Sequence, residues 1–224
     1  MSRKVVRITL DHLAAFDPPC RRCLFWEYDP VRRGRTSDLR AAKDAWVSEV
    51  LREWGSCGRV ALVDDEPVGL AIYAPEAFLP GAAGLPTAPI STDAVLLTTV
   101  YVDPRHRGGG LGRMLVQGMA RDLIEREVGA VEAFGSAGRL DGRCLLPVDF
   151  LGGVGFHTQR PHPQTPRLRM DLRTAVSWRD EVESALERLL GVIRPVPKST
   201  RGPASRTTRA SRTTRATGGG AQAM

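Results

Sequence analysis

Residues 94–113 read AVLLTTVYVDPRHRGGGLGR, an apolar run followed by a turn with three adjacent glycines. Almost every residue of 94–102 is apolar or β-branched, which predicts a strand buried on both faces in the middle of a sheet. From Leu111 to Leu123 a leucine or methionine recurs at every fourth residue, which predicts a helix that Gly129 closes. The predicted order is therefore strand, glycine turn, helix.

The glycine turn suits an anionic ligand. Glycines let the backbone approach a ligand closely, and the start of a helix adds unpaired N–H donors and a partial positive charge. Together these features predict a pyrophosphate site. The alternative is a turn that only joins a strand to a helix, but a glycine costs roughly 0.5–1 kcal/mol relative to alanine in regular structure.

The spacing of the glycines distinguishes this turn from two known phosphate-binding motifs. A P-loop would place lysine and then serine or threonine after its last glycine, whereas Leu111 and Gly112 follow Gly110. A dinucleotide fingerprint would need a glycine at position 113, which is Arg113. Neither motif is present.

The turn resembles the signature of the GNAT superfamily of acyl-CoA N-acyltransferases, Arg/Gln-x-x-Gly-x-Gly/Ala after a strand, at Arg107, Gly110 and Gly112. Residues 150–156, FLGGVGF, are similar to the superfamily's short helix that ends in Gly-Phe. The resemblance implies acetyl-CoA as co-substrate and no metal, with the pantetheine on the strand backbone and the pyrophosphate on the loop. The residues that it assigns to the cofactor are Val100, Tyr101, Val102, Arg107, Gly108, Gly109, Gly110, Leu111, Gly112 and Arg113.

The other elements fit the same fold. Strands interspersed with helices predict an α/β or α+β domain. The resemblance implies a central mixed, mostly antiparallel sheet of about seven strands, flanked by helices. Besides 94–102, the predicted strands are 5–10, 59–63, 67–74, 130–134, 156–160 and 167–172. A helix is predicted from Ser37, its N-cap, to Gly55, and a short helix at 150–153. The turn 64–66 predicts a hairpin, and residues 75–93 predict an irregular loop.

The C-terminal part differs in composition from the rest. Residues 177–190 predict a last helix, so we place a GNAT-like domain at 1–190 and a basic, disordered tail at 191–224. The tail repeats SRTTRA at 205–210 and 211–216. Its seven basic residues and lack of acidic ones account for the whole formal net charge of +7. The domain itself is formally neutral.

Several features indicate a cytoplasmic protein. The chain opens without a secretory signal, and no apolar run is long enough to span a bilayer, so we expect no membrane contact. Only three of the 32 basic residues are lysines, which favours a bacterial source. We expect a monomer or a homodimer.

Acyl transfer to an amine requires a group that takes a proton from the ammonium. Some GNAT members that modify protein N-termini carry a glutamate on the fifth strand, and Glu132 is similar in place. Glu132 is therefore the candidate base. The alternative is that Glu132 is an ordinary strand glutamate that faces solvent. The family's usual acid is a tyrosine at the position of Leu151. Tyr101 is therefore the acid candidate, with Tyr28 and His157 as others, although a thiolate leaves readily without an acid.

A second motif, CRRCLFWE at residues 20–27, is similar, together with GRC at 142–144, to segments of an uncharacterised bacterial GNAT subgroup. Cys20 and Cys23 have the spacing of half a zinc site, but no second pair exists. Buried, reduced thiols are the preferred interpretation. Glu27 is a secondary catalytic candidate, with an ordinary surface charge as the alternative.

The sequence thus predicts an N-acetyltransferase that moves an acetyl group from acetyl-CoA to a primary amine of an unidentified small molecule or protein. The alternative is a non-catalytic protein that binds or senses acyl-CoA and is tethered to nucleic acid by its tail. Leu151 favours the second class, whereas Glu132 and the glycine turn favour the first. Residues 194–215 predict at most weak, non-specific nucleic-acid contact, because no aromatic residues accompany the arginines, and an inert repeat is the alternative.

Overall fold

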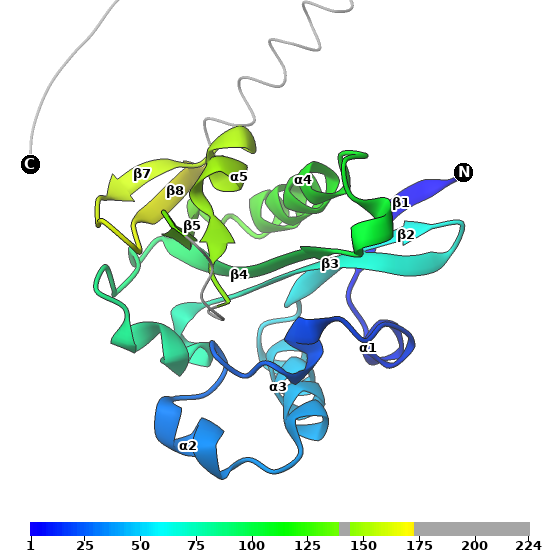
Figure 1. Ribbon diagram of the computed structural model, residues 1–224, viewed down its shortest axis with the longest axis horizontal. Coiled ribbons are helices and arrows are strands. Elements are labelled where there is room, and N and C mark those ends of the chain that lie inside the picture. The colour runs from blue at the N-terminus through cyan, green and yellow to red at the C-terminus, as the bar shows by residue number, and fades with distance from the viewer. Residues whose placement is uncertain (139–143, 173–224) are drawn as a thin grey trace, which may run out of the picture. The chain divides into compact units, whose positions relative to one another are not determined.

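The computed structural model describes residues 1–138 and 144–172, all within the compact unit Met1–Glu183. The predicted helix at 177–190 and the predicted tail at 191–224 lie outside the described residues. The described part is an eight-stranded mixed sheet with helices on both faces (Figure 1). The predicted fold class is confirmed.

The sheet has the strand order β1-β2-β3-β4-β5-β8-β7, with β6 paired to β5. Within it, only β4–β5 and β5–β6 are parallel pairs. The strands are β1 (Arg3–Arg7), β2 (Gly58–Val63), β3 (Glu66–Ala74), β4 (Ala94–Val102), β5 (Ala130–Ser136), β6 (Leu146–Pro147), β7 (His157–Arg160) and β8 (Arg167–Asp171).

Helices α4 (Leu111–Glu125) and α5 (Val148–Gly153) cover one face of the sheet, which we call the α4 face (Figure 1). The opposite face, the α3 face, carries α1 (Leu10–Ala15), α2 (Pro30–Arg35) and α3 (Leu39–Glu53). Each face has its own apolar core. None of the helices described combines the length and the apolar character needed to cross a bilayer. Four short 3-10 turns, Pro19–Arg22, Glu76–Phe78, Pro80–Gly84 and Pro104–His106, join these elements.

Three predicted boundaries are wrong for local reasons. Helix α3 is capped by Asp38 rather than Ser37, because the Asp38 carboxylate accepts hydrogen bonds from the first-turn amides. Strand β1 ends at Arg7, before Leu10, because Thr9 caps α1. Helix α4 ends at Glu125, before Gly129, and Glu127 takes a left-handed conformation at φ +60°. The predicted hairpin between β2 and β3 is confirmed, with Asp64 and Asp65 both at positive φ in its turn.

Strands β4 and β5 pair over only three residues each. The register joins Ala94–Leu96 to Ala130–Glu132, and beyond these residues the two strands are not paired with each other. Strand β4 nevertheless stays paired with β3 as far as Val102. Strand β6 pairs with Gly135 and Ser136 and also lies against β4. The sheet therefore opens between β4 and β5, and the edge of β4 that faces the opening leads directly to the glycine turn.

Candidate active site

The glycine turn has the backbone that the sequence predicts for anion binding. Gly108 and Gly110 have φ of +78° and +81°, which a residue with a side chain adopts only at a cost. Gly110 is the N-cap of α4 and provides no side chain to accept a hydrogen bond from the first turn. Because the first amides of a helix have no intrahelical acceptor, the exposed turn presents N–H donors that have no acceptor within residues 1–138 and 144–172.

Two side chains fix the start of this loop. Arg107 donates from Nε to the carbonyl of Val102 at 3.0 Å, which ties the loop to the end of β4. Asp103 accepts from the Arg105 guanidinium at 3.1 Å and from its backbone N–H at 2.9 Å, and these bonds lower the pKa of Asp103 to about 2. On the other side, Arg3 donates to the carbonyl of Gly109 at 2.8 Å. Arginine side chains thus hold the last carbonyl of β4, at Val102, and one carbonyl of the loop, at Gly109.

Helix α5 packs closely on the start of α4. A Cβ atom added at Gly112 would lie 3.0 Å from Cε2 of Phe150, so a glycine allows this approach. Arg113 donates from Nη2 to the carbonyl of Gly153 at 2.7 Å. The two motifs that the sequence analysis quoted, the glycine turn and FLGGVGF, therefore lie against each other. Leu151, at the family's tyrosine position, is fully buried in the core of the α4 face.

Tyr101 lies on the part of β4 that is not paired with β5. Its ring packs on Phe16 of the α3 face at a centroid distance of 5.9 Å, and the Arg107 guanidinium stands 5.9 Å from the ring centroid. Tyr101 is partly exposed. The two other acid candidates lie elsewhere: Tyr28 is buried beneath the Arg32 guanidinium, and His157 is exposed on β7.

Glu132 is fully buried at the last paired position between β4 and β5. Its carboxylate accepts from the Ser91 hydroxyl at 2.5 Å and from the Ser91 backbone N–H at 3.2 Å. Arg167 and Arg169 of β8 approach the two carboxylate oxygens at 3.2 and 3.3 Å. The alternative of a solvent-facing glutamate is wrong, since the side chain joins β5, β8 and the loop before β4.

Ser91, the hydrogen-bond partner of Glu132, was not among the predicted site residues. Ser91 lies in the segment 75–93, for which the sequence predicted only an irregular loop. It is partly exposed, whereas Glu132 has no exposed surface. The Ser91 hydroxyl is therefore the neutral group that links the buried carboxylate to the surface.

Glu27 is also buried, and the surface-charge alternative for it is wrong. It forms an ion pair with Lys43 of α3, and both side chains are 2% exposed or less. Among the described residues, none forms a hydrogen bond with the Glu27 Oε2 atom. The neighbouring Trp26 stacks on Phe134 of β5 at a centroid distance of 5.9 Å. The motif CRRCLFWE thus packs on the α3 face, close to the strand that carries Glu132.

All four cysteines are free, but the buried-thiol prediction holds fully only for Cys57. Cys20, Cys23 and Cys144 are partly exposed. In the described ranges, no group of three or more His, Cys, Asp or Glu side chains is placed to hold a metal ion.

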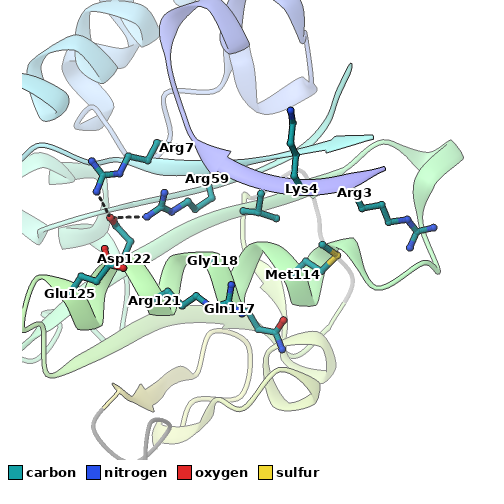
Figure 2. A pocket seen from close by; sticks show the side chains of 11 residues that line it. Arg3, Lys4, Arg7, Arg59, Met114, Gln117, Gly118, Arg121, Asp122 and Glu125 are labelled. Atoms are coloured by element: carbon teal, nitrogen blue, oxygen red, sulfur yellow. Dashed lines mark ion pairs between the residues drawn. The ribbon is translucent and has the colours of Figure 1, made fainter. Parts of the chain in front are cut away.

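A basic groove of about 470 Å³ runs between β1 and α4, beside the glycine turn (Figure 2). At its base, Asp122 of α4 is fully buried and pairs with Arg59 at 2.7 Å and with Arg7 at 3.6 Å. Burial alone would raise the pKa of Asp122, but hydrogen bonds from Ser56 and Tyr73 and the charge of Arg59 lower it. Asp122 therefore holds β1 and β2 onto α4.

The geometry places a strand, a glycine turn and the start of a helix beside an opened sheet, a combination that suits an anionic ligand. The chain belongs to the GNAT acetyltransferase family, whose family model matches residues 15–138. No curated protein sequence matches it.

Two solved structures with TM-scores of 0.50 and 0.52 share the fold, and a third is similar at a lower score. An N-acetyltransferase from Staphylococcus aureus Mu50 is similar, with a TM-score of 0.52 and 13% identity over 77% of this chain and 99% of that chain. The loading GNATL domain of CurA from Lyngbya majuscula has a TM-score of 0.50 and 11% identity over 78% of this chain and 100% of that chain. PaiA N-acetyltransferase from Thermoplasma acidophilum, solved with coenzyme A, has a TM-score of 0.46 and 11% identity over 76% of this chain and 99% of that chain.

Proposed function

We propose that this chain transfers an acetyl group from acetyl-CoA to a primary amine. The observation that carries the proposal is the exposed glycine turn at the start of α4, which follows the unpaired edge of β4. An extended strand edge offers hydrogen bonds to the amides of a pantetheine arm, and the helix start offers donors to a pyrophosphate. We assign Val100–Val102 to the first contact and Gly108–Arg113 to the second.

The reaction forms a bond between the amine nitrogen and the acetyl carbon and breaks the bond from that carbon to the thioester sulfur. The amine must lose a proton, and the sulfur leaves as a thiolate that is stable enough to need no donor. We propose that Glu132 takes the proton through the Ser91 hydroxyl, because Glu132 itself has no exposed surface. Tyr101, on the part of β4 that is not paired with β5, is the group that we propose to protonate the thiolate after it has left.

The first test is turnover of Glu132→Gln and Ser91→Ala with a panel of amines. We expect both variants to lose about 10²-fold or more in turnover at neutral pH, the usual range for general-base catalysis, with coenzyme A affinity unchanged. Arg169→Met is the matched control, since it removes an ion pair of Glu132 but keeps its carboxylate. If Arg169→Met lowers turnover as much, Glu132 anchors β8 and is not the base.

The second candidate function is acyl-CoA binding without turnover. One observation favours it: the buried Leu151 replaces the family's tyrosine and points into the core. Calorimetry with coenzyme A and an acetylation assay on one protein sample separate the two functions. Tight binding with no transfer to any amine of the panel, including peptide N-termini and polyamines, would favour the sensor. A cytoplasmic location stays a prediction for either function.

A further inference from the structure

Cys23 and Cys144 lie in contact, although 121 residues separate them in sequence. Cys23 follows the 3-10 turn Pro19–Arg22, and Cys144 precedes β6. Their Sγ atoms are 2.6 Å apart, close to the roughly 2.05 Å of a disulfide bond. Both side chains are partly exposed, so a small oxidant can reach them.

The contact between the two segments does not depend on sulfur alone. Trp26 donates from Nε1 to the carbonyl of Cys144 at 3.0 Å. The Trp26 ring is itself 2% exposed and stacked on Phe134 of β5. A fixed aromatic side chain three residues after Cys23 therefore holds the backbone of Cys144 in place, and the two thiols are presented to each other by the fold.

The four cysteines differ in their expected reactivity. The hydrogen bond from Cys144 lowers the pKa of Cys23 to about 6, and the charge of Lys43 acts in the same direction. The same bond raises the pKa of Cys144, since the pair shares one proton. Burial raises the pKa of Cys20 and of Cys57 to about 12. Because the thiolate is the nucleophile, Cys23 is the reactive member at neutral pH.

We propose that Cys23 and Cys144 form a peroxide-reactive thiol pair that closes to an intramolecular disulfide. The Cys23 thiolate attacks one oxygen of hydrogen peroxide, so that an S–O bond forms and Cys23 becomes a sulfenic acid. The O–O bond breaks, and the other oxygen leaves as hydroxide, which takes up a proton to form water. The Cys144 sulfur then attacks the sulfenic sulfur and forms the S–S bond, and the S–O bond breaks as the departing hydroxide takes the proton of the Cys144 thiol and leaves as a second water. One peroxide is reduced and two thiols are oxidised.

The bond would join two parts of the candidate site. Strand β6 pairs with Gly135 and Ser136 at the open end of β5, and the disulfide would tie the segment that leads into β6 to the turn on the α3 face. A cross-link between residues so far apart in sequence also restricts the unfolded chain, so the oxidised protein should melt at a higher temperature. Formation of the bond does not depend on the proposed acetyl transfer.

The test uses full-length protein that is reduced, freed of reductant and treated with one equivalent of hydrogen peroxide. We expect the four thiols that react with Ellman's reagent after denaturation to fall to two, the intact mass to fall by two hydrogen atoms, and a Cys23–Cys144 linked peptide to appear. Dithiothreitol should reverse all three changes, and the melting temperature should rise only in the oxidised protein.

Variants at each cysteine make the assignment specific. Cys144→Ser should form no bridge and should accumulate a Cys23 sulfenic acid that dimedone traps. Cys20→Ser and Cys57→Ala, the matched controls, should bridge at the rate of the unchanged protein. A bridge that involves Cys20 or Cys57, a bridge only between two chains, or four thiols that survive peroxide at a level that oxidises free cysteine would each overturn the proposal.

Discussion

The glycine turn and the buried ion pairs beside β5 use charge in different ways. On the α4 face, the candidate cofactor site is backbone: glycines at positive φ and free amides at the start of a helix. On the α3 side of the central strands, charged side chains are removed from water and paired, Glu27 with Lys43 and Glu132 with two arginines of β8. Backbone sites depend on a few consecutive residues, whereas the paired charges depend on contacts between distant segments.

This difference predicts that the two kinds of site fail differently. A change in the glycine turn should weaken ligand binding and leave the fold intact. A change in a buried ion pair should destabilise the fold first, because removing one partner leaves an uncompensated buried charge.

Lys43→Met should have the largest effect of these changes, a loss in the free energy of unfolding. It leaves the Glu27 carboxylate buried without its cation, and breaking a buried pair costs about 3–5 kcal/mol. Urea unfolding followed by tryptophan fluorescence measures the loss, and coenzyme A affinity of the folded fraction should be unchanged. The double variant Glu27→Leu with Lys43→Met is the control and should recover most of the stability. A stable single variant would mean that the pair is not buried in solution.

Gly110→Glu should weaken coenzyme A binding by about 100-fold, which corresponds to about 2.7 kcal/mol. The substitution adds a negative charge where a pyrophosphate is expected and a side chain at φ +81°. Calorimetry measures the affinity. The matched control is Gly34→Glu, because Gly34 lies on α2 at an open position with no neighbouring atom within 4 Å of an added Cβ. Unchanged affinity in a folded Gly110→Glu would remove the turn from the cofactor site.

Gly118→Ala should have a smaller effect, on stability only. A Cβ atom at Gly118 would lie 2.7 Å from Cγ1 of Val5, so α4 would have to move away from β1. Overpacking typically costs 1–3 kcal/mol, and the better helix propensity of alanine offsets about 1 kcal/mol of it. We expect a net loss of about 1 kcal/mol. In the background of Val5→Ala the same substitution should be neutral or stabilising, and a loss of equal size there would place the strain elsewhere.

The contrast between backbone and side chains also explains what the sequence could predict. The strand–turn–helix at 94–125 followed from local patterns, because hydrophobic periodicity and glycine act over a few residues. The two motifs that meet at Gly112 and Phe150 each had a local signature, but the contact between them was not predicted. The partners of Glu132 and Glu27 could not be predicted, because Ser91, Arg169 and Lys43 reach them through strand register and packing. Nothing in the composition distinguishes a buried glutamate from an exposed one.

Deletion of residues 195–224 should have the smallest effect, although it removes almost all of the charge excess. Six of the seven basic residues after Leu190 lie in this segment, together with no acidic residue and almost no large apolar side chain. Because such a composition buries little apolar surface, we expect the melting temperature and coenzyme A affinity to match those of the full chain. Weak binding to single-stranded oligonucleotides should disappear with the segment.

Salt dependence shows whether that binding is only electrostatic. In the full chain, affinity should be indifferent to sequence and should fall steeply as salt rises, because arginines spaced three apart release counterions from phosphates. The basic groove between β1 and α4 is the competing source, since it stays in the truncated protein. Anisotropy titrations of both proteins at several salt concentrations separate the two. Binding that survives truncation would assign the attraction to the groove, and a truncated protein that unfolds would refute the domain boundary near residue 190.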